Sequence, residues 1–134
     1  MTGIIIGAAI ATPPVYTTVV VGSSSYYYSD GVYMVPQGSG VVVVAAPAGA
    51  TIVTLPAGYC EVLSDSGKYF YCNGVYYKPM SGKYIVIAAP KGAVVPMVPE
   101  GYKVVVVGDI TYYDYQGVRY MPALVEGQNV YVVQ

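Results

Sequence analysis

The sequence predicts an all-β protein built from three tandem units of about 43 residues, and three observations support this fold class. The chain is rich in Val and Tyr, which favour strands, and in Gly and Pro, which favour turns. Its residues recur with a period of about 43 positions. Every copy contains one short hairpin motif. Each unit should therefore be a small SH3-like barrel or meander of short antiparallel strands, and units this small should pack on one another.

The period is visible as residues that recur at constant spacing in all three copies. These columns are Pro13/Pro56/Pro99, Tyr16/Tyr59/Tyr102, Val19/Val62/Val105, Tyr26/Tyr69/Tyr112, Gly31/Gly74/Gly117, Val32/Val75/Val118 and Pro36/Pro79/Pro122. They divide the chain into a first unit at 1–46, a second at 47–89 and a third at 90–134. We expect the first unit to begin with an apolar N-terminal strand.

The second unit shows the expected order of elements most clearly. An extended segment with two turns occupies 47–59. Residues that favour turns then separate four expected strands, at 60–63, 69–72, 75–79 and 84–89. The other units should follow the same order, because they share its turn columns.

The hairpin motif at the centre of each unit reads YSDGVYMVP at 28–36, YCNGVYYKP at 71–79 and DYQGVRYMP at 114–122. Asp-Gly and Asn-Gly predict a two-residue type I′ turn, because both turn positions need positive φ. Gln116 fits the first turn position less well.

These turns also predict which side chains face each other across the hairpins. The expected pairs are Tyr28/Tyr33, Tyr71/Tyr76 and Asp114/Arg119. An opposite-charge pair in the third unit thus replaces an aromatic pair in the other two. Because either kind of pair stabilises neighbouring strands, the exchange supports the register.

Both cysteines, Cys60 and Cys72, lie in the second unit. If 64–68 forms the turn of its first hairpin, residues 63 and 69 pair and the two thiols face each other within reach of a disulfide. A Cys60–Cys72 disulfide would indicate an oxidising compartment. The alternative is two buried free thiols in a cytosolic protein.

The residue types exclude several classes of function. The chain has no His, which excludes Ser-His-Asp and Cys-His catalysis, and two Cys cannot close a structural zinc site. Gly-rich phosphate-binding motifs are absent. The acidic residues fall mostly at expected turns, so we expect no metal and no cofactor. A net charge of −1 provides no basic patch for nucleic acid.

Charge is concentrated in the second and third units, since Asp30 is the only charged residue among the first 60. Either Tyr, Ser and Thr hydroxyls hydrate the surface of the first unit, or another chain covers it. Pro and Gly interrupt the uncharged stretch at 31–60, so we expect no transmembrane segment. The apolar start of the chain lacks the basic residues of a signal peptide.

The 17 tyrosines divide into two expected groups. Those in repeated columns, Tyr59, Tyr69, Tyr102 and Tyr112, are expected in the core or at half-buried surface positions where their hydroxyls reach water. Others near the hairpins are candidates for an exposed aromatic surface that stacks on a ligand. These surface candidates are Tyr27, Tyr28, Tyr33, Tyr76, Tyr77 and Tyr120.

The stretch at 69–122, in which Tyr-rich hairpins alternate with segments such as GAVV and PEGYKVVVVG, resembles a known family. It is similar to uncharacterised exported bacterial proteins of a domain-of-unknown-function family, whose repeats read GYVVVAPP-GAVV-LP-GY. The resemblance covers the chain from about residue 41 onward, and the first copy departs from it at 3–25. It implies a location in the bacterial cell envelope or outside the cell, and it supplies no catalytic residues.

These observations favour a non-enzymatic structural protein that assembles with copies of itself, for example into a filament. The chain is close to three whole repeats long, so it ends near the position within the repeat at which it starts. The N-terminal segment of a neighbouring copy could therefore continue the repeat as a donated strand. The residues of this expected strand are Ile4, Ile5, Ile6 and Ile10. The alternative is a monomeric cell-surface module that binds carbohydrate or peptide through its tyrosines. An enzyme with a carboxylate site is the third hypothesis.

Overall fold

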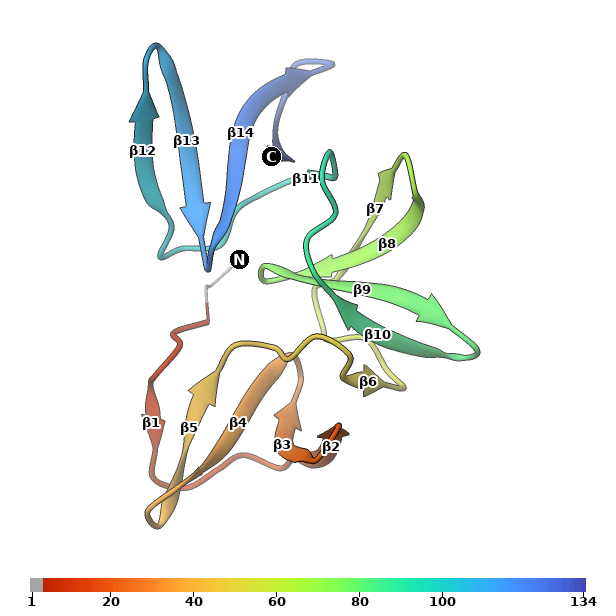
Figure 1. Cartoon of the computed structure of the whole chain (residues 1–134), viewed down its shortest axis with the longest axis vertical. Coiled ribbons are helices and arrows are strands. Elements are labelled where there is room, and N and C mark those ends of the chain that lie inside the picture. The colour runs from red at the N-terminus through yellow and green to blue at the C-terminus, as the bar shows by residue number, and fades with distance from the viewer. Residues whose placement is uncertain (1–3) are drawn as a thin grey trace.

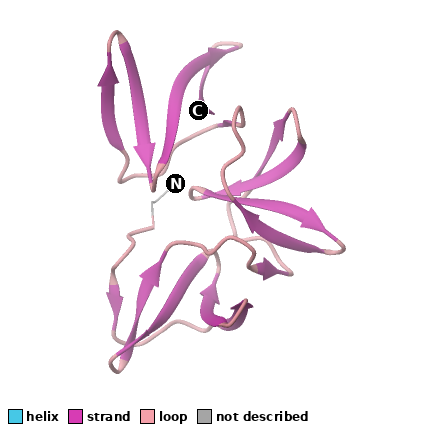
Figure 2. Cartoon of the chain, in the orientation of Figure 1, coloured by secondary structure: helices cyan, strands magenta, loops and turns pink. Residues whose placement is uncertain are grey.

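The computed structural model describes residues 4–134, which form three five-stranded antiparallel sheets and no helix (Figures 1 and 2). The first sheet contains β1 (Ala9–Ile10), β2 (Thr17–Val21), β3 (Ser24–Ser29), β4 (Val32–Gln37) and β5 (Gly40–Val44). The second contains β6 (Thr51–Ile52), β7 (Cys60–Ser64), β8 (Gly67–Cys72), β9 (Val75–Met80) and β10 (Lys83–Ile87). The third contains β11 (Val94–Val95), β12 (Lys103–Val107), β13 (Ile110–Tyr115), β14 (Val118–Val125) and β15 (Gln128–Val133). The predicted all-β fold of three tandem units is confirmed.

Each sheet is an open meander rather than a closed barrel. Four strands run up and down, and the short first strand pairs with the last one, in the orders β1-β5-β4-β3-β2, β6-β10-β9-β8-β7 and β11-β15-β14-β13-β12. The last hairpin is the longest, because β14 has eight residues where β4 and β9 have six. Figure 1 shows the three sheets around a common centre, toward which the β8–β9 and β13–β14 turns point.

The central hairpin of each unit has the predicted turn. The first turn residue has a φ of 40° at Asp30, 49° at Asn73 and 48° at Gln116, and the glycine after each also has a positive φ. Gln116 therefore adopts the same turn as the two residues that favour it. The predicted cross-strand pairs are all present, namely Tyr28/Tyr33, Tyr71/Tyr76 and Asp114/Arg119.

The N-terminal segment belongs to the first sheet. The Gly7 amide donates to the carbonyl of Val43, and β1 pairs with β5 with Ile10 opposite Val41. The other two units repeat this turn, with the amides of Gly49 and Gly92 donating to the carbonyls of Val86 and Val133. The first unit therefore builds the same sheet although its sequence departs from the other copies, because backbone hydrogen bonds and a glycine turn define this strand.

The first hairpin of the second unit differs from the prediction. β7 and β8 are joined by a two-residue turn at 65–66 instead of a five-residue turn at 64–68, and Cys60 lies opposite Tyr71 rather than Cys72. Because side chains alternate between the two faces of a strand, this shift sends the two thiols to opposite faces of the sheet. Both cysteines are free in the structure. The predicted pairing is wrong, and the disulfide that rested on it is not formed.

Candidate functional site

Two of the hydrophobic clusters in the described residues lie between units, one joining the first sheet to the second and one joining the second to the third. We call the side that a unit turns to the next unit its forward face, and the side that it turns to the preceding unit its rear face. In the first cluster the forward face is Val19, Val21, Tyr28, Tyr33, Val44 and Ala46, and the rear face is Ala50, Ile52, Leu55, Phe70, Val75, Tyr77, Tyr84 and Val86.

The second cluster repeats the first at equivalent positions. Its forward face is Cys60, Val62, Tyr71, Tyr76, Ile87 and Ala89, and its rear face is Ala93, Val95, Val98, Tyr113, Tyr115, Val118, Tyr120, Tyr131 and Val133. Only Cys60 and Tyr115 have no counterpart in the first cluster. The chain therefore makes one kind of face-to-face contact twice, and most of its apolar core belongs to these contacts rather than to single units.

Pairs of tyrosine hydroxyls lie at the middle of both contacts. The Tyr33 hydroxyl is 3.3 Å from that of Tyr77, and the Tyr76 hydroxyl is 2.9 Å from that of Tyr120. Each of the four side chains is at most 1% exposed. Burial raises the pKa of Tyr33 to about 12, and its hydrogen bond with Tyr77 opposes the rise. These four tyrosines were candidates for an exposed surface, and the structure instead buries them, because the neighbouring unit supplies each hydroxyl with a hydrogen-bond partner.

The first unit has a rear face with no forward face opposite it. A third cluster consists of Met34, Val41 and Val43, with Ile4, Ala8, Ile10, Tyr27 and Val32 packed against it. All except Ile4 occupy columns equivalent to the rear faces of the other two units. Ala8 and Ile10 are half-buried, whereas their counterparts Ala50 and Ile52 are 0% and 6% exposed. Within residues 4–134, no forward face of another unit contacts this rear face, although Met34, Val41 and Val43 at its centre are only 0–5% exposed.

The forward face of the third unit differs from the other two. Val105 and Val107 keep its apolar columns, but Asp114 and Arg119 replace the tyrosine pair. Arg119 Nε donates to Asp114 Oδ1 at 2.8 Å, and Nη2 donates to Oδ2 at 3.0 Å. These hydrogen bonds hold the pKa of Asp114 below its usual range. The described stack thus ends on a face that is partly apolar and partly charged.

The isoleucines of the predicted assembly strand lie within the same chain's contacts. Ile10 is part of β1, and the Ile4 carbonyl accepts a hydrogen bond from the Tyr115 hydroxyl of the third unit at 3.4 Å. Ile5 is 74% exposed and Ile6 is 42% exposed. Only the two exposed side chains are thus turned to solvent, and β1 itself already has a partner strand.

A row of aromatic pairs lies at the surface, one pair in each unit. The pairs Tyr16/Tyr27, Tyr59/Phe70 and Tyr102/Tyr113 have ring centroids 4.2, 5.6 and 4.9 Å apart. The first member of each pair is exposed, by 40%, 48% and 43%. Tyr59 and Tyr102 were expected in the core or at half-buried surface positions, and they lie at the surface with their rings packed against Phe70 and Tyr113, respectively. Tyr69 is buried as predicted, while Tyr112 and the surface candidates Tyr27 and Tyr28 are half-buried.

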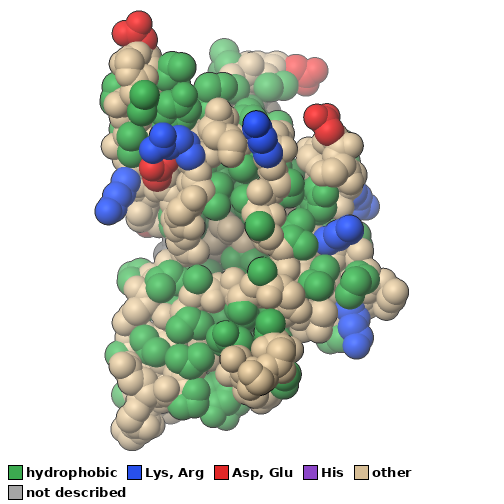
Figure 3. Space-filling view, in the orientation of Figure 1, with side chains coloured by type: hydrophobic (Ala, Val, Ile, Leu, Met, Phe, Trp, Pro, Cys, Tyr) green, Lys and Arg blue, Asp and Glu red, His purple; other side chains and the backbone are tan. Residues whose placement is uncertain are grey.

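Charged side chains lie mainly on the second and third units. Figure 3 shows no Lys, Arg, Asp or Glu on the visible face of the first unit, in the lower part of the view. An ion pair joins Lys68 and Glu61 at 3.2 Å in the second unit. Among residues 4–134, no three Cys, Asp or Glu side chains gather into a possible metal site. The same residues include no helix that could span a membrane.

Residues 5–134 match the family described as Family of unknown function (DUF6515), so the chain belongs to that family. No curated protein and no solved structure matches the chain. The family match agrees with the resemblance to a domain of unknown function, and it names no activity.

Proposed function

We propose that this member of DUF6515 is a non-enzymatic structural protein of the bacterial cell envelope or exterior that assembles with copies of itself. The rear face of the first unit carries the proposal, because no forward face of another unit contacts it among residues 4–134. Ala8 and Ile10 on this face are half-buried, and a partly exposed apolar face commonly marks an interaction site. The chain itself indicates what fits this face, because the same columns are covered by a forward face in the other two units.

The forward face of the third unit is the matching surface on a second copy. Val105 and Val107 supply its apolar columns, and Val107 is 53% exposed. A contact between this face and the rear face of another first unit joins copies head to tail. Head-to-tail contacts that do not close into a ring build filaments.

Strand donation remains part of the proposal in a modified form. β1 pairs with β5 of its own sheet, so a donated strand must first leave that sheet and take the same place in a neighbour, as in domain swapping. The location outside the cytoplasm is supported by the resemblance to exported proteins. The free cysteines add no support to it.

Assembly is tested by light scattering over a range of concentrations, combined with electron microscopy of the full chain. We expect oligomers or filaments, and we expect Ile10→Asp, on the rear face of the first unit, to reduce them to monomers. Val20→Asp is the matched control, because Val20 is 62% exposed on β2 and, like its counterpart Leu63, belongs to none of the three clusters. A wild-type chain that stays monomeric at every concentration would contradict the proposal.

Strand donation is tested by mixing two single-cysteine variants, Ile10→Cys and Val41→Cys, each made with Cys60 and Cys72 replaced by Ser. These two positions lie opposite each other in the β1–β5 pair. Oxidation of the mixture yields covalent dimers only if β1 of one copy pairs with β5 of another. If only the double variant in one chain forms the cross-link, copies assemble without exchanging β1.

The row of exposed aromatic pairs favours one alternative, a monomeric surface module that binds carbohydrate or peptide. Tyr59 and Tyr102 present rings of the kind that stack on sugars and apolar side chains. Under this alternative, Tyr59→Ala and Tyr102→Ala abolish ligand binding and leave a monomer unchanged. Under the main proposal, neither substitution affects assembly.

A further inference from the structure

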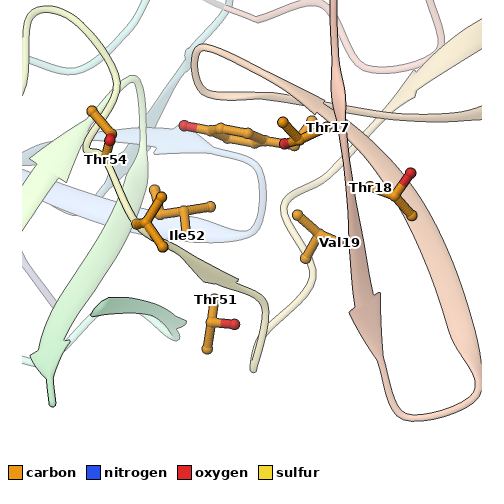
Figure 4. A pocket seen from close by; sticks show the side chains of 8 residues that line it. Thr17, Thr18, Val19, Thr51, Ile52 and Thr54 are labelled. Atoms are coloured by element: carbon orange, nitrogen blue, oxygen red, sulfur yellow. The ribbon is translucent and has the colours of Figure 1, made fainter. Parts of the chain in front are cut away.

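A groove of about 370 Å³ lies between the first two units. β2 forms one wall with Thr17, Thr18 and Val19, and the segment at 51–54 forms the other. Figure 4 shows Thr17 and Val19 on the side of β2 that faces 51–54, whereas the Thr18 side chain points away from it. Tyr28 and Val53 complete its lining. No charged side chain lines the groove, and both of its walls carry hydroxyl groups next to apolar ones.

The hydroxyl groups are specific to this contact. Thr17, Thr18, Thr51 and Thr54 line the groove, whereas the equivalent positions of the contact between the second and third units hold Cys60, Glu61, Val94 and Met97. The repeat preserves the apolar columns here but not these four threonines. The hydroxyl lining therefore cannot be explained by the contact that both pairs of units share.

Tyr28 supplies an independent observation. The hydroxyl of its counterpart Tyr71 donates to the Met97 carbonyl at 2.9 Å and so closes the second contact at this point. The Tyr28 hydroxyl is buried and has no hydrogen-bond partner in the described part of the chain. A buried hydroxyl without a partner costs free energy. A ligand that reaches the Tyr28 hydroxyl after a small movement of this side chain recovers that free energy through a hydrogen bond.

We propose that this groove binds a neutral saccharide unit. A sugar ring carries hydroxyls that both donate and accept hydrogen bonds, which the threonines and Tyr28 can match. Its C–H faces suit the apolar side chains of Val19, Ile52 and Val53, and the lack of charge selects against acidic sugars. The proposal does not depend on self-assembly, because the groove lies within one chain.

The test is NMR titration of the full chain with two uncharged probes, maltotriose and tri-N-acetylchitotriose, and with an acidic probe, trigalacturonic acid. We expect an uncharged probe to shift the Thr methyl signals of the groove, and the acidic probe to leave them unmoved. Tyr28→Phe and Thr54→Val should each weaken binding roughly 2- to 10-fold, the effect of one hydrogen bond. Thr111→Val, on β13 and outside the groove, is the matched control.

The outcomes separate clearly. Shifts confined to the groove and weakened by both variants support the proposal. Absence of binding by both uncharged probes overturns it, as does binding that the two variants leave unchanged. Preferential binding of the acidic probe overturns it as well, because no cation lines the groove. Thr54→Val changes an exposed residue, so it tests the groove even if Tyr28→Phe alters folding.

Discussion

The two contacts between units share their apolar columns but satisfy different polar groups. In the second contact the Tyr71 hydroxyl is bonded to Met97, while the equivalent Tyr28 hydroxyl of the first contact has no partner among the described residues. The reverse holds at the hairpin turns. Asp30 Oδ1 accepts a hydrogen bond from the Ala57 amide at 2.8 Å, whereas the Asn73 side-chain oxygen is buried without a partner in the described chain.

This difference shows which features a repeat preserves. Apolar side chains need only volume and a neighbour, so one pattern of Val and Tyr serves both contacts. Hydrogen bonds need a defined distance and angle, so a small change in how two units meet makes one bond and breaks another. Each contact has consequently lost a different polar bond while its apolar columns are unchanged.

Alkaline pH should break both contacts and have the largest effect. Burial raises the pKa of Tyr33 to about 12 and also raises that of Tyr71 and Tyr76. The pKa of tyrosine in an unfolded chain is about 10. The stability that these buried neutral tyrosines contribute is therefore fully present below about pH 10, and it is lost as the pH rises through their pKa values in the folded protein. We expect cooperative unfolding, with tyrosinate absorbance, between about pH 10 and 12. Ionisation of these tyrosines without loss of the circular dichroism of the sheets would contradict this.

Replacing the glycine of each central turn by Ala should show how closely each turn is packed against its surroundings. A Cβ at Gly74 lies 2.5 Å from the Tyr115 ring, one at Gly31 lies 3.1 Å from Pro56, and one at Gly117 meets nothing within 4 Å. All three have positive φ, so each Ala substitution should cost about 1–2 kcal/mol in backbone strain. Gly74→Ala should cost about 1–3 kcal/mol more through overpacking. Urea unfolding measures these losses, and equal losses at all three positions would show that the turns are not packed as described.

Removing one hydroxyl from each contact should have smaller and opposite effects. Tyr71→Phe removes the partner of the Met97 carbonyl and should destabilise the fold by about 1 kcal/mol. Tyr28→Phe removes a buried hydroxyl that lacks a partner and should leave stability unchanged or raise it. Thermal or urea unfolding of the two variants checks the comparison, which fails if Tyr28→Phe is the more destabilising change.

The Asp114–Arg119 ion pair on the forward face of the third unit should contribute least to the stability of the fold, because surface ion pairs are weak. Its hydrogen bonds lower the pKa of Asp114, so the stabilisation is present above the usual aspartate pKa of about 4 and is lost as the pH falls through the folded value. Arg119→Gln should remove this small acid dependence of stability. An unchanged acid limb in unfolding experiments from pH 2 to 6 would show that the pair does not contribute.

Local features of the fold could be predicted from the residues. Asp30-Gly31 and Asn73-Gly74 specify their turn, and a two-residue turn leaves only one register for Tyr28 opposite Tyr33. The β7–β8 register could not be predicted in this way. Its turn at 65–66 is Asp-Ser, without the Asn-Gly or Asp-Gly signature, so a shorter and a longer turn fitted equally well, and the difference of one residue moved Cys72 to the other face.

The candidate site was less accessible to sequence reasoning. Tyr33 and Tyr76 lie near the hairpin turns and were therefore surface candidates, while Tyr59 sits in a repeated column, which indicated a core or half-buried position. The structure buries Tyr33 and Tyr76 and leaves Tyr59 48% exposed. One signal could have helped: Tyr33 and Tyr77 are 44 residues apart, as are Tyr76 and Tyr120, and a spacing one residue longer than the period marks contacts between equivalent strands of successive units.

Sequence pattern alone therefore predicted the all-β class, the three units, their central turns and the cross-strand pairs of the central hairpins, because these follow from φ preferences and strand alternation over a few residues. The tertiary structure decided which tyrosines are buried, which hydroxyls are bonded and which rear face has no forward face of another unit against it. These properties depend on how one sheet lies on the next, and small differences in that placement decide whether a hydrogen bond forms. The rear face of the first unit and the hydroxyl-lined groove beside β2 could therefore be recognised only from the packing of the sheets.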